Sequence, residues 1–77
     1  MPLFFFDVFD GQEFWTDTEG TEHADLAAAR LEAVDTITGM SRETFPLNGA
    51  SALSIDIRTE DGLARERVTV TLSFKTL

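Results

Sequence analysis

Apolar and polar residues alternate at both ends of the chain, and this pattern predicts two β-hairpins. Residues 3–9 (LFFFDVF) form an aromatic-rich strand that Asp10–Gly11 closes with a turn, and a return strand is expected from Gln12 to about Asp17. Residues 53–58 alternate strictly and precede a turn at 60–62. Residues 68–75 alternate again, and four of their side chains are predicted to point inward: Val68, Val70, Leu72 and Phe74.

Between the hairpins, Asp25 to about Glu43 repeats apolar residues every three or four positions, which predicts one helix with Asp25 as its N-cap. Gly39 either ends this helix or weakens its last turn, and Pro46 disfavours helix from Phe45 onward. Phe45 and Leu47 in the connector 45–51 are expected to close one end of the core. The inward stripe is predicted to be Leu26, Ala29, Ala33, Ile37 and Met40, widened by Ala27, Leu31 and Val34.

The order ββαββ predicts an α+β fold in a single domain over residues 1–77, with a four-stranded, mostly antiparallel sheet and one helix packed on one face. Side chains alternate between the faces of a strand, so Phe4, Phe6 and Val8 are expected beneath the helix. One helix covers only one face. Leu3, Phe5 and Phe9, on the other face, are therefore the predicted interface residues. The alternative is a small patch that Trp15 or a terminus shields.

The net charge of −8, from six basic and fourteen acidic residues, argues against binding to nucleic acid or to an anionic membrane. A protein partner of such a chain is expected to be basic. The absence of cysteine excludes disulfides and a Cys-type zinc site. No apolar run is long enough to span a membrane, and Met1–Pro2 leads into a strand without a signal-peptide pattern, so a cytoplasmic protein is expected.

Candidate chemistry in the sequence is sparse. His23, the single histidine, is expected to be exposed in a loop, and no nucleophile-elbow, phosphate-loop or zinc-protease motif occurs. Clustered carboxylates favour hard cations, but Trp15 stands where the calcium-loop pattern requires Asp or Asn, so solvated charge is the preferred interpretation. We therefore predict no catalytic residue, cofactor or metal. The first 25 residues contain seven acids: Asp7, Asp10, Glu13, Asp17, Glu19, Glu22 and Asp25.

Arg30 falls within the apolar arc of the predicted helix and has two interpretations. Its side chain either reaches solvent from the helix edge, as long basic side chains do, or it pairs with a carboxylate of the sheet or a loop. The ion pair is preferred, and it would tie the helix to the acidic N-terminal half.

The segments MPLFFFDVFDG and DTEGTEHADLAAARLEA resemble a family of small uncharacterised alphaproteobacterial proteins with an FFDV-like strand, a DxEGTE-like loop and a DLxAARxEA helix start. That family has no assigned activity, so the resemblance implies no catalytic residues. Ala24 departs from its pattern, because a proline often precedes the capping Asp25 there. A weaker likeness to HicB-type antitoxins rests on residues 25–33. That family usually has a third strand before the helix and a GYxxxxPxLPG-like segment, and both are missing from the pattern of this chain.

Together these observations predict a non-enzymatic, cytoplasmic protein–protein interaction module that forms a homodimer through Leu3, Phe5 and Phe9. The alternative is a HicB-like antitoxin or another regulatory protein that binds a partner.

Overall fold

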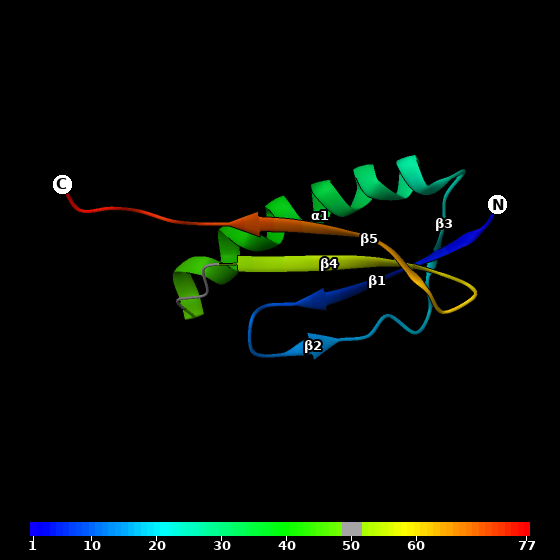
Figure 1. Ribbon diagram of the computed structural model, residues 1–77, viewed down its shortest axis with the longest axis horizontal. Helices are drawn as coiled ribbons and strands as arrows, with labels where there is room; N and C mark the ends of the chain where they lie inside the picture. The colour runs from blue at the N-terminus through cyan, green and yellow to red at the C-terminus, as the bar shows by residue number, and fades with distance from the viewer. Residues whose placement is uncertain (49–51) are drawn as a thin grey trace.

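The computed structural model describes residues 1–48 and 52–77, with the backbone alone for 46–48, and consists of one helix over one face of a sheet (Figure 1). The sheet order is β2-β1-β4-β5; β3 pairs with the same edge of β1 as β2, and every pairing is antiparallel. The elements are β1 (Leu3–Phe9), β2 (Phe14–Trp15), β3 (Thr21–Glu22), α1 (Leu26–Asn48), β4 (Ala52–Thr59) and β5 (Ala64–Thr71).

The α+β class and the single covered face are confirmed, and two corrections concern the first half of the sheet. Residues 21–22, expected to lie in a loop, pair with Leu3 and Phe4, so the sheet has five strands instead of four. The return strand, expected from 12 to 17, is confined to β2. The carboxylate of Asp10 accepts the backbone N–H groups of Gln12 and Glu13 at 2.9 and 2.7 Å, and this turn delays pairing until Phe14.

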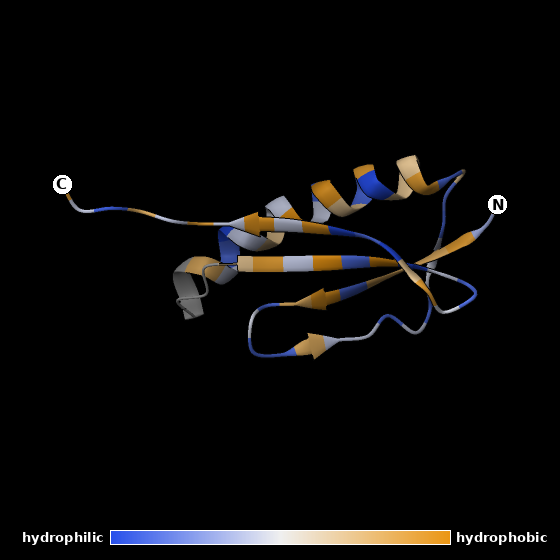
Figure 2. Cartoon of the chain, in the orientation of Figure 1, coloured by the Kyte–Doolittle hydropathy of each residue, from blue (hydrophilic) through white to orange (hydrophobic). Residues whose placement is uncertain are grey.

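The structure differs more from the prediction in the second hairpin. The last strand was predicted at 68–75, but β5 begins at Ala64 and ends at Thr71. Thr71 pairs with Ala52, the first residue of β4, so no strand of the described chain continues the ladder beyond it. Leu72 and Phe74, predicted to point inward, are therefore exposed. They lie on a C-terminal arm, residues 72–77, that projects from the sheet (Figures 1 and 2).

The start of α1 follows the prediction and its end does not. Asp25 caps the helix, because its Oδ1 accepts the N–H of Ala28 at 2.9 Å. The helix then continues past Gly39 and Pro46 to Asn48, although Pro46 was expected to stop it. A proline inside a helix costs about 3 kcal/mol, and the packing of Phe45 against the core opposes that cost. The side chain of Leu47, predicted to close the core, lies outside the described residues.

The core lies between α1 and the sheet, mainly over β4 and β5. Two alanines of the helix are fully buried, which lets the helix approach the sheet closely. Ala27, Leu31 and Val34 do not widen the apolar stripe as predicted, because all three are exposed to solvent. Phe6 and Val8 pack against the core from β1, as expected. The buried apolar side chains are Phe4, Ala29, Ala33, Ile37, Leu53, Ile55 and Ile57.

Candidate protein-contact surface

The sheet face opposite α1 carries charged and aromatic side chains in cross-strand rows. Strand pairing places Asp7 opposite Asp56, and Asp56 in turn opposite Arg67. Two residues further along β1, Phe9 lies opposite Ser54, and two residues in the other direction Phe5 lies opposite Arg58. Directly paired residues project to the same face, so these side chains line one continuous surface.

A network around Asp7 holds one end of this surface together. Asp7 is only 7% exposed, and its carboxylate accepts the Nε–H of Arg58 at 3.0 Å and the backbone N–H of Asp17 at 2.9 Å. Arg58 also donates to the carbonyl oxygen of Asp17 at 2.8 Å. The buried carboxylate is thus paired and hydrogen-bonded, as a charge with little solvent contact requires.

The carboxylate of Asp17 replaces a strand along the outer edge of β1. β2 and β3 pair with the two ends of that edge and leave its middle open. There, Asp17 Oδ2 accepts the N–H of Phe6 at 3.1 Å, while Oδ1 accepts the N–H groups of Glu19 and Gly20. Burial raises the pKa of Asp17, but these N–H groups and Arg58 together hold it below its ordinary value of 3.8.

Phe5 does not form part of an open aromatic patch. The guanidinium carbon of Arg58 lies 4.6 Å from the centre of its ring, a cation–π contact, and Gly20 lies against the ring edge. Phe5 therefore anchors the loop before β3 and the side chain of Arg58. This role is structural, and it leaves only part of the ring accessible.

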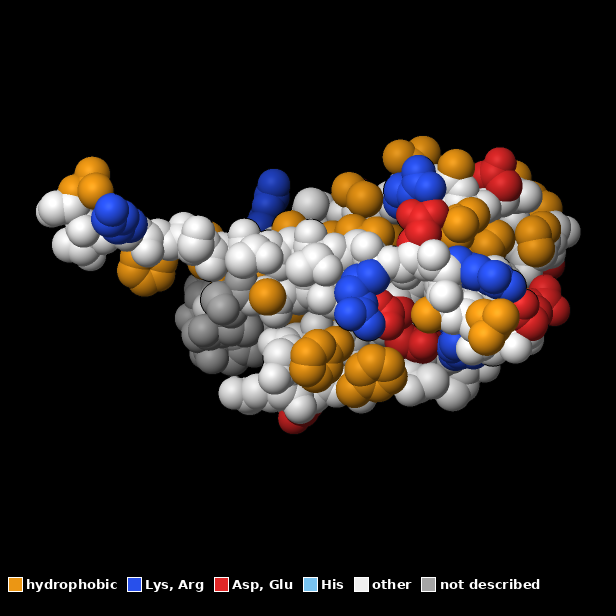
Figure 3. Space-filling view, viewed as in Figure 1, with side chains coloured by type: hydrophobic (Ala, Val, Ile, Leu, Met, Phe, Trp, Pro, Cys, Tyr) orange, Lys and Arg blue, Asp and Glu red, His pale blue; other side chains and the backbone are white. Residues whose placement is uncertain are grey.

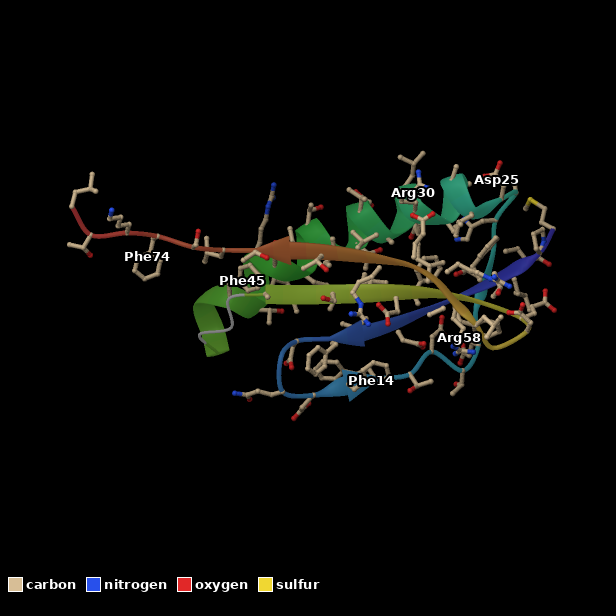
Figure 4. All side chains as sticks on the ribbon, in the orientation of Figure 1. Phe14, Asp25, Arg30, Phe45, Arg58 and Phe74 are labelled. Carbon is tan, nitrogen blue, oxygen red and sulfur yellow. The ribbon has the colours of Figure 1, made fainter. Side chains whose placement is uncertain are left out.

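Phe9 and Phe14 form the exposed aromatic part of the surface. Their rings are tilted, with centres 6.3 Å apart, and they are 42% and 57% exposed. They line a hollow of about 380 Å³ whose other walls are Asp7, Ser54, Asp56 and Arg67. In Figure 3 hydrophobic side chains lie beside basic and acidic ones on the face turned to the viewer, and Figure 4 labels Phe14 on β2. We call this hollow the aromatic hollow.

Arg67 and Asp56 form the polar wall of the aromatic hollow. Arg67 Nε and Asp56 Oδ1 are 2.6 Å apart, and a second N–H of Arg67 reaches Oδ2 at 2.9 Å. This bidentate pair lowers the pKa of Asp56 and raises that of Arg67. Asp56 is also the cross-strand neighbour of Asp7. Each of these two adjacent carboxylates is paired with its own arginine, Asp7 with Arg58 and Asp56 with Arg67.

The three predicted interface residues do not form a single exposed patch. Phe9 opens into the aromatic hollow, Phe5 lies under Arg58, and Leu3 is half-buried at the far end of β1, where its N–H donates to Glu60. Phe14 was not among the predicted residues. The signal that could have found it is the Asp10–Gly11 turn, which brings Phe14 opposite Phe9. Trp15 pairs with Val8 and so projects to the other face, where it does not shield Phe9.

His23 lies in a different environment from the one predicted, and Arg30 follows its prediction in part. His23 was expected to be exposed, but its ring packs against Phe4 and Phe6, with centres 6.2 and 5.7 Å away, and its Nε2 is buried without a partner in the described chain. Arg30 forms the preferred ion pair, with two N–O contacts of 2.6 Å to Glu66. Glu66 belongs to β5, so this contact joins the helix to the C-terminal hairpin and not to the acidic N-terminal half.

Carboxylates with lowered pKa values predict how stability depends on pH. In each case the folded-state pKa is below the ordinary 3.8 or 4.5, so the stabilisation is present above that value and is lost as pH falls through the folded pKa. We expect a constant Tm from pH 7 to about 5 and a decrease below about 4.5. The groups are Asp10, Asp17, Asp56, Asp61 and Glu66.

Protonation also relieves the repulsion of a chain with net charge −8, which acts in the opposite direction. Thermal melts from pH 7 to 3 at low salt and at high salt separate the two effects, because salt screens distant charges more than close contacts. The decrease is expected in both series. A Tm that rises on acidification in high salt would contradict it.

Substitution of Gly20 by alanine is predicted to lower the free energy of unfolding more than the same substitution at Gly62. Both Gly20 and Gly62 have left-handed backbones, with φ of +74° and +85°, so alanine costs about 1–2 kcal/mol at either position. At Gly20 the added Cβ would also lie 2.9 Å from Phe5 and 3.2 Å from the carbonyl oxygen of Phe4. At Gly62 it would meet open space.

Urea unfolding of Gly20→Ala and its matched control Gly62→Ala tests this difference. Gly20→Ala is expected to lose about 2 kcal/mol, close to 1 kcal/mol more than the control, because only the first substitution adds a steric contact to the backbone strain. Equal losses would show that the loop before β3 moves freely away from Phe5.

The fold and this surface define a small α+β protein in which one helix covers one face of a sheet and the other face bears an aromatic hollow. Residues 3–71 match the family model "Domain of unknown function (DUF6894)", and the chain belongs to that family. No curated protein and no solved structure matches it. Within the described residues, no helix is long and apolar enough to cross a membrane, and no three His, Cys, Asp or Glu residues are grouped to hold a metal ion.

Proposed function

We propose that this protein is a non-catalytic protein–protein interaction module of the cytoplasm that works as a homodimer and binds a partner protein in its aromatic hollow. The single observation that supports this proposal most is the exposed pair Phe9 and Phe14, seated on the sheet face that α1 leaves uncovered. Exposed aromatic side chains beside a hollow are typical of contact sites, where a few such residues supply most of the binding energy.

The charges around the aromatic hollow favour a basic partner. Asp10 and Glu13 lie in the turn that joins the two aromatic positions, and the whole chain has eight more acids than bases. Asp7 and Asp56 in the walls are already paired with arginines, so they orient a ligand less strongly than the turn acids do. The expected ligand is a segment with an aromatic or aliphatic side chain next to Lys or Arg.

Peptide selection with the purified full chain tests this binding site. We expect wild-type protein to enrich peptides that combine an apolar side chain with Lys or Arg, and the pair of substitutions Phe9→Ser and Phe14→Ser to weaken their binding at least about tenfold, as hot-spot truncations do. Leu63→Ser, an exposed apolar residue in the β4–β5 turn, is the matched control and should bind normally. Enrichment without this composition, or equal binding by all three proteins, would refute the proposal.

One feature of the fold supports the second candidate, a HicB-like antitoxin. β3 adds a third strand before the helix, and the sequence pattern had lacked that strand. An antitoxin of this kind neutralises a toxic partner, so wild-type protein should restore the growth of cells that express a basic toxin bound by it. The Phe9→Ser, Phe14→Ser protein should not. If both proteins restored growth equally, the aromatic hollow would not be the site that binds the toxin.

A further inference from the structure

The C-terminal arm has the side-chain pattern of a strand but no strand beside it among residues 1–48 and 52–77. β5 has Val68 and Val70 on its helix-covered face, and the same alternation continues through Leu72 and Phe74 in the arm. Phe74 is 91% exposed, and Figure 4 shows it projecting from the arm well away from the folded body. The arm therefore continues an amphipathic strand whose apolar side chains stay half-exposed at Leu72 and almost fully exposed at Phe74.

The outer edge of β5 offers the position that such a strand needs. β5 is the last strand in the sheet order, so within the described residues its outer edge has no partner strand. Next to the end of β5, a hollow of about 360 Å³ opens towards the last turns of α1; its walls are Ser41, Arg42, Phe45, Val70, Thr71 and Leu72. Phe74 of the same chain does not reach this hollow, since an extended arm moves it about 13 Å beyond Val70.

We propose that two copies of this chain pair antiparallel along the outer edges of β5, about a twofold axis at Leu72, so that each arm extends the sheet of the other copy. In this register Phe74 of one copy lies opposite Val70 of its partner, beside the hollow lined by Phe45. An exposed edge strand is a ready template for pairing with another chain, and an identical edge makes the contact isologous. Both helices then cover the same face of one continuous sheet.

The register follows from the side chains of β5 and the arm. A centre at Leu72 places Thr69 opposite Lys75 and Thr71 opposite Ser73, so no like charges meet. A twofold axis at Thr71 would place Lys75 opposite Arg67, and an axis at Val70 would place Lys75 opposite Arg65. Like charges directly opposite each other are destabilising. A register shifted by a single residue would set the apolar face of one arm against the polar face of the other.

The charge distribution also selects a second copy as the occupant of this edge. Two chains of net charge −8 repel each other, and seven of the fourteen acids lie in the first 25 residues. From residue 64 to the end there are three bases and one acid. Arg65 and Arg67 are paired with Asp61 and Asp56, and Glu66 with Arg30, so this edge is nearly neutral. Identical chains can approach here without the repulsion of their acidic halves.

This inference rests on the proposed homodimer and names its interface. The experiment must therefore distinguish failure of the homodimer from failure of the β5 pairing. Sedimentation equilibrium of the 77-residue chain at high micromolar concentration gives the oligomeric state first. We expect a dimer, with a dissociation constant at least about tenfold higher for Phe74→Ser, because an aromatic anchor in an interface contributes that much. Leu63→Ser and the Phe9→Ser, Phe14→Ser protein should dimerise as wild type does. Phe74 is exposed in the single chain, so its loss does not threaten folding.

Cysteine cross-linking tests the register itself, since the chain has no cysteine of its own. Residues paired across the axis have Cα atoms about 4.5–5.5 Å apart, within the range that a disulfide spans. Leu72→Cys is therefore expected to form a covalent dimer under mild oxidation faster than Thr71→Cys or Leu63→Cys. A monomeric wild type would refute both the homodimer and the β5 pairing. A dimer insensitive to Phe74→Ser, or equal cross-linking by the three cysteine variants, would refute the pairing alone.

Discussion

The substitution Asp7→Ala is expected to lower the free energy of unfolding by about 3 kcal/mol, a large part of the roughly 4–12 kcal/mol typical for a chain of this length. Asp7 is almost fully buried, and its carboxylate accepts hydrogen bonds from two groups: Arg58, through Nε at 3.0 Å and a second N–H at 3.4 Å, and the backbone N–H of Asp17 at 2.9 Å. Without the carboxylate, both donors face a site that offers them little water. Unsatisfied donors of this kind cost about 1–3 kcal/mol each.

One effect opposes this loss, because Asp7 lies opposite Asp56 and its removal relieves a like-charge contact. That relief is the smaller effect, since the bidentate pair with Arg67 already neutralises Asp56. The loop from Asp17 to Gly20 is also held through Asp7, so the substitution loosens the edge of β1 as well as the ion pair.

Thermal and urea unfolding measure this loss. A change of about 3 kcal/mol corresponds to a decrease in Tm of roughly 12–24 °C for a domain of this size. Asp7→Asn, whose amide oxygen still accepts a hydrogen bond, should lose less than Asp7→Ala. Asp35→Ala, at an exposed position of α1, is the control and should unfold as wild type does. If Asp7→Ala matched that control, the network would contribute no net stability.

Ile37→Ala is expected to have an effect of similar size for a different reason. Ile37 is 1% exposed and packs from the middle of α1 against the buried aliphatic side chains of β4. Truncating a buried isoleucine removes apolar contact area and leaves a cavity, which costs about 2–5 kcal/mol together. The neighbouring core residues Ala29 and Ala33 are too small to fill that space.

Leu31→Ala is the matched control, because Leu31 belongs to the same helix and is 72% exposed. Alanine is the best helix former, so this control is expected to stay within about 0.5 kcal/mol of wild type or to gain slightly. Urea unfolding of both variants checks the contrast. Equal losses would mean that α1 does not pack on the sheet through the face described above.

The core could be predicted from sequence because it depends on periodicity. Alternation from Leu53 to Ile57 and the helical spacing of Ala29, Ala33 and Ile37 each identify one buried face, and only one arrangement buries both. The faces of β1 follow in the same way: Phe4 is buried and Phe9 is exposed as expected. Leu31 was assigned to the stripe because it is apolar, although the narrow contact with the sheet leaves it in solvent.

Several element boundaries depend on partners that are distant in sequence, and for the ends of α1 and β5 the predictions were wrong. Residues 72–75 alternate as well as Val68 and Val70 do, but β4 begins at Ala52 and offers them nothing to pair with. Pro46 ends helices by local preference, yet α1 continues past it. The exposure of Phe5 likewise depends on Arg58, which is more than fifty positions away in the sequence. No local pattern predicts that Arg58 lies over the Phe5 ring.

The two hairpins around one helix, the N-cap at Asp25 and the buried faces could all be predicted from the order of residues alone, because each depends on spacing within a few residues. Which surfaces remain open follows only from the complete fold. It paired Asp7 with Arg58 and covered Phe5, brought Phe14 beside Phe9 in the aromatic hollow, and left Phe74 on an arm without a partner. The solvent exposure of a side chain depends on which other segments cover it, and those segments come from every part of the chain.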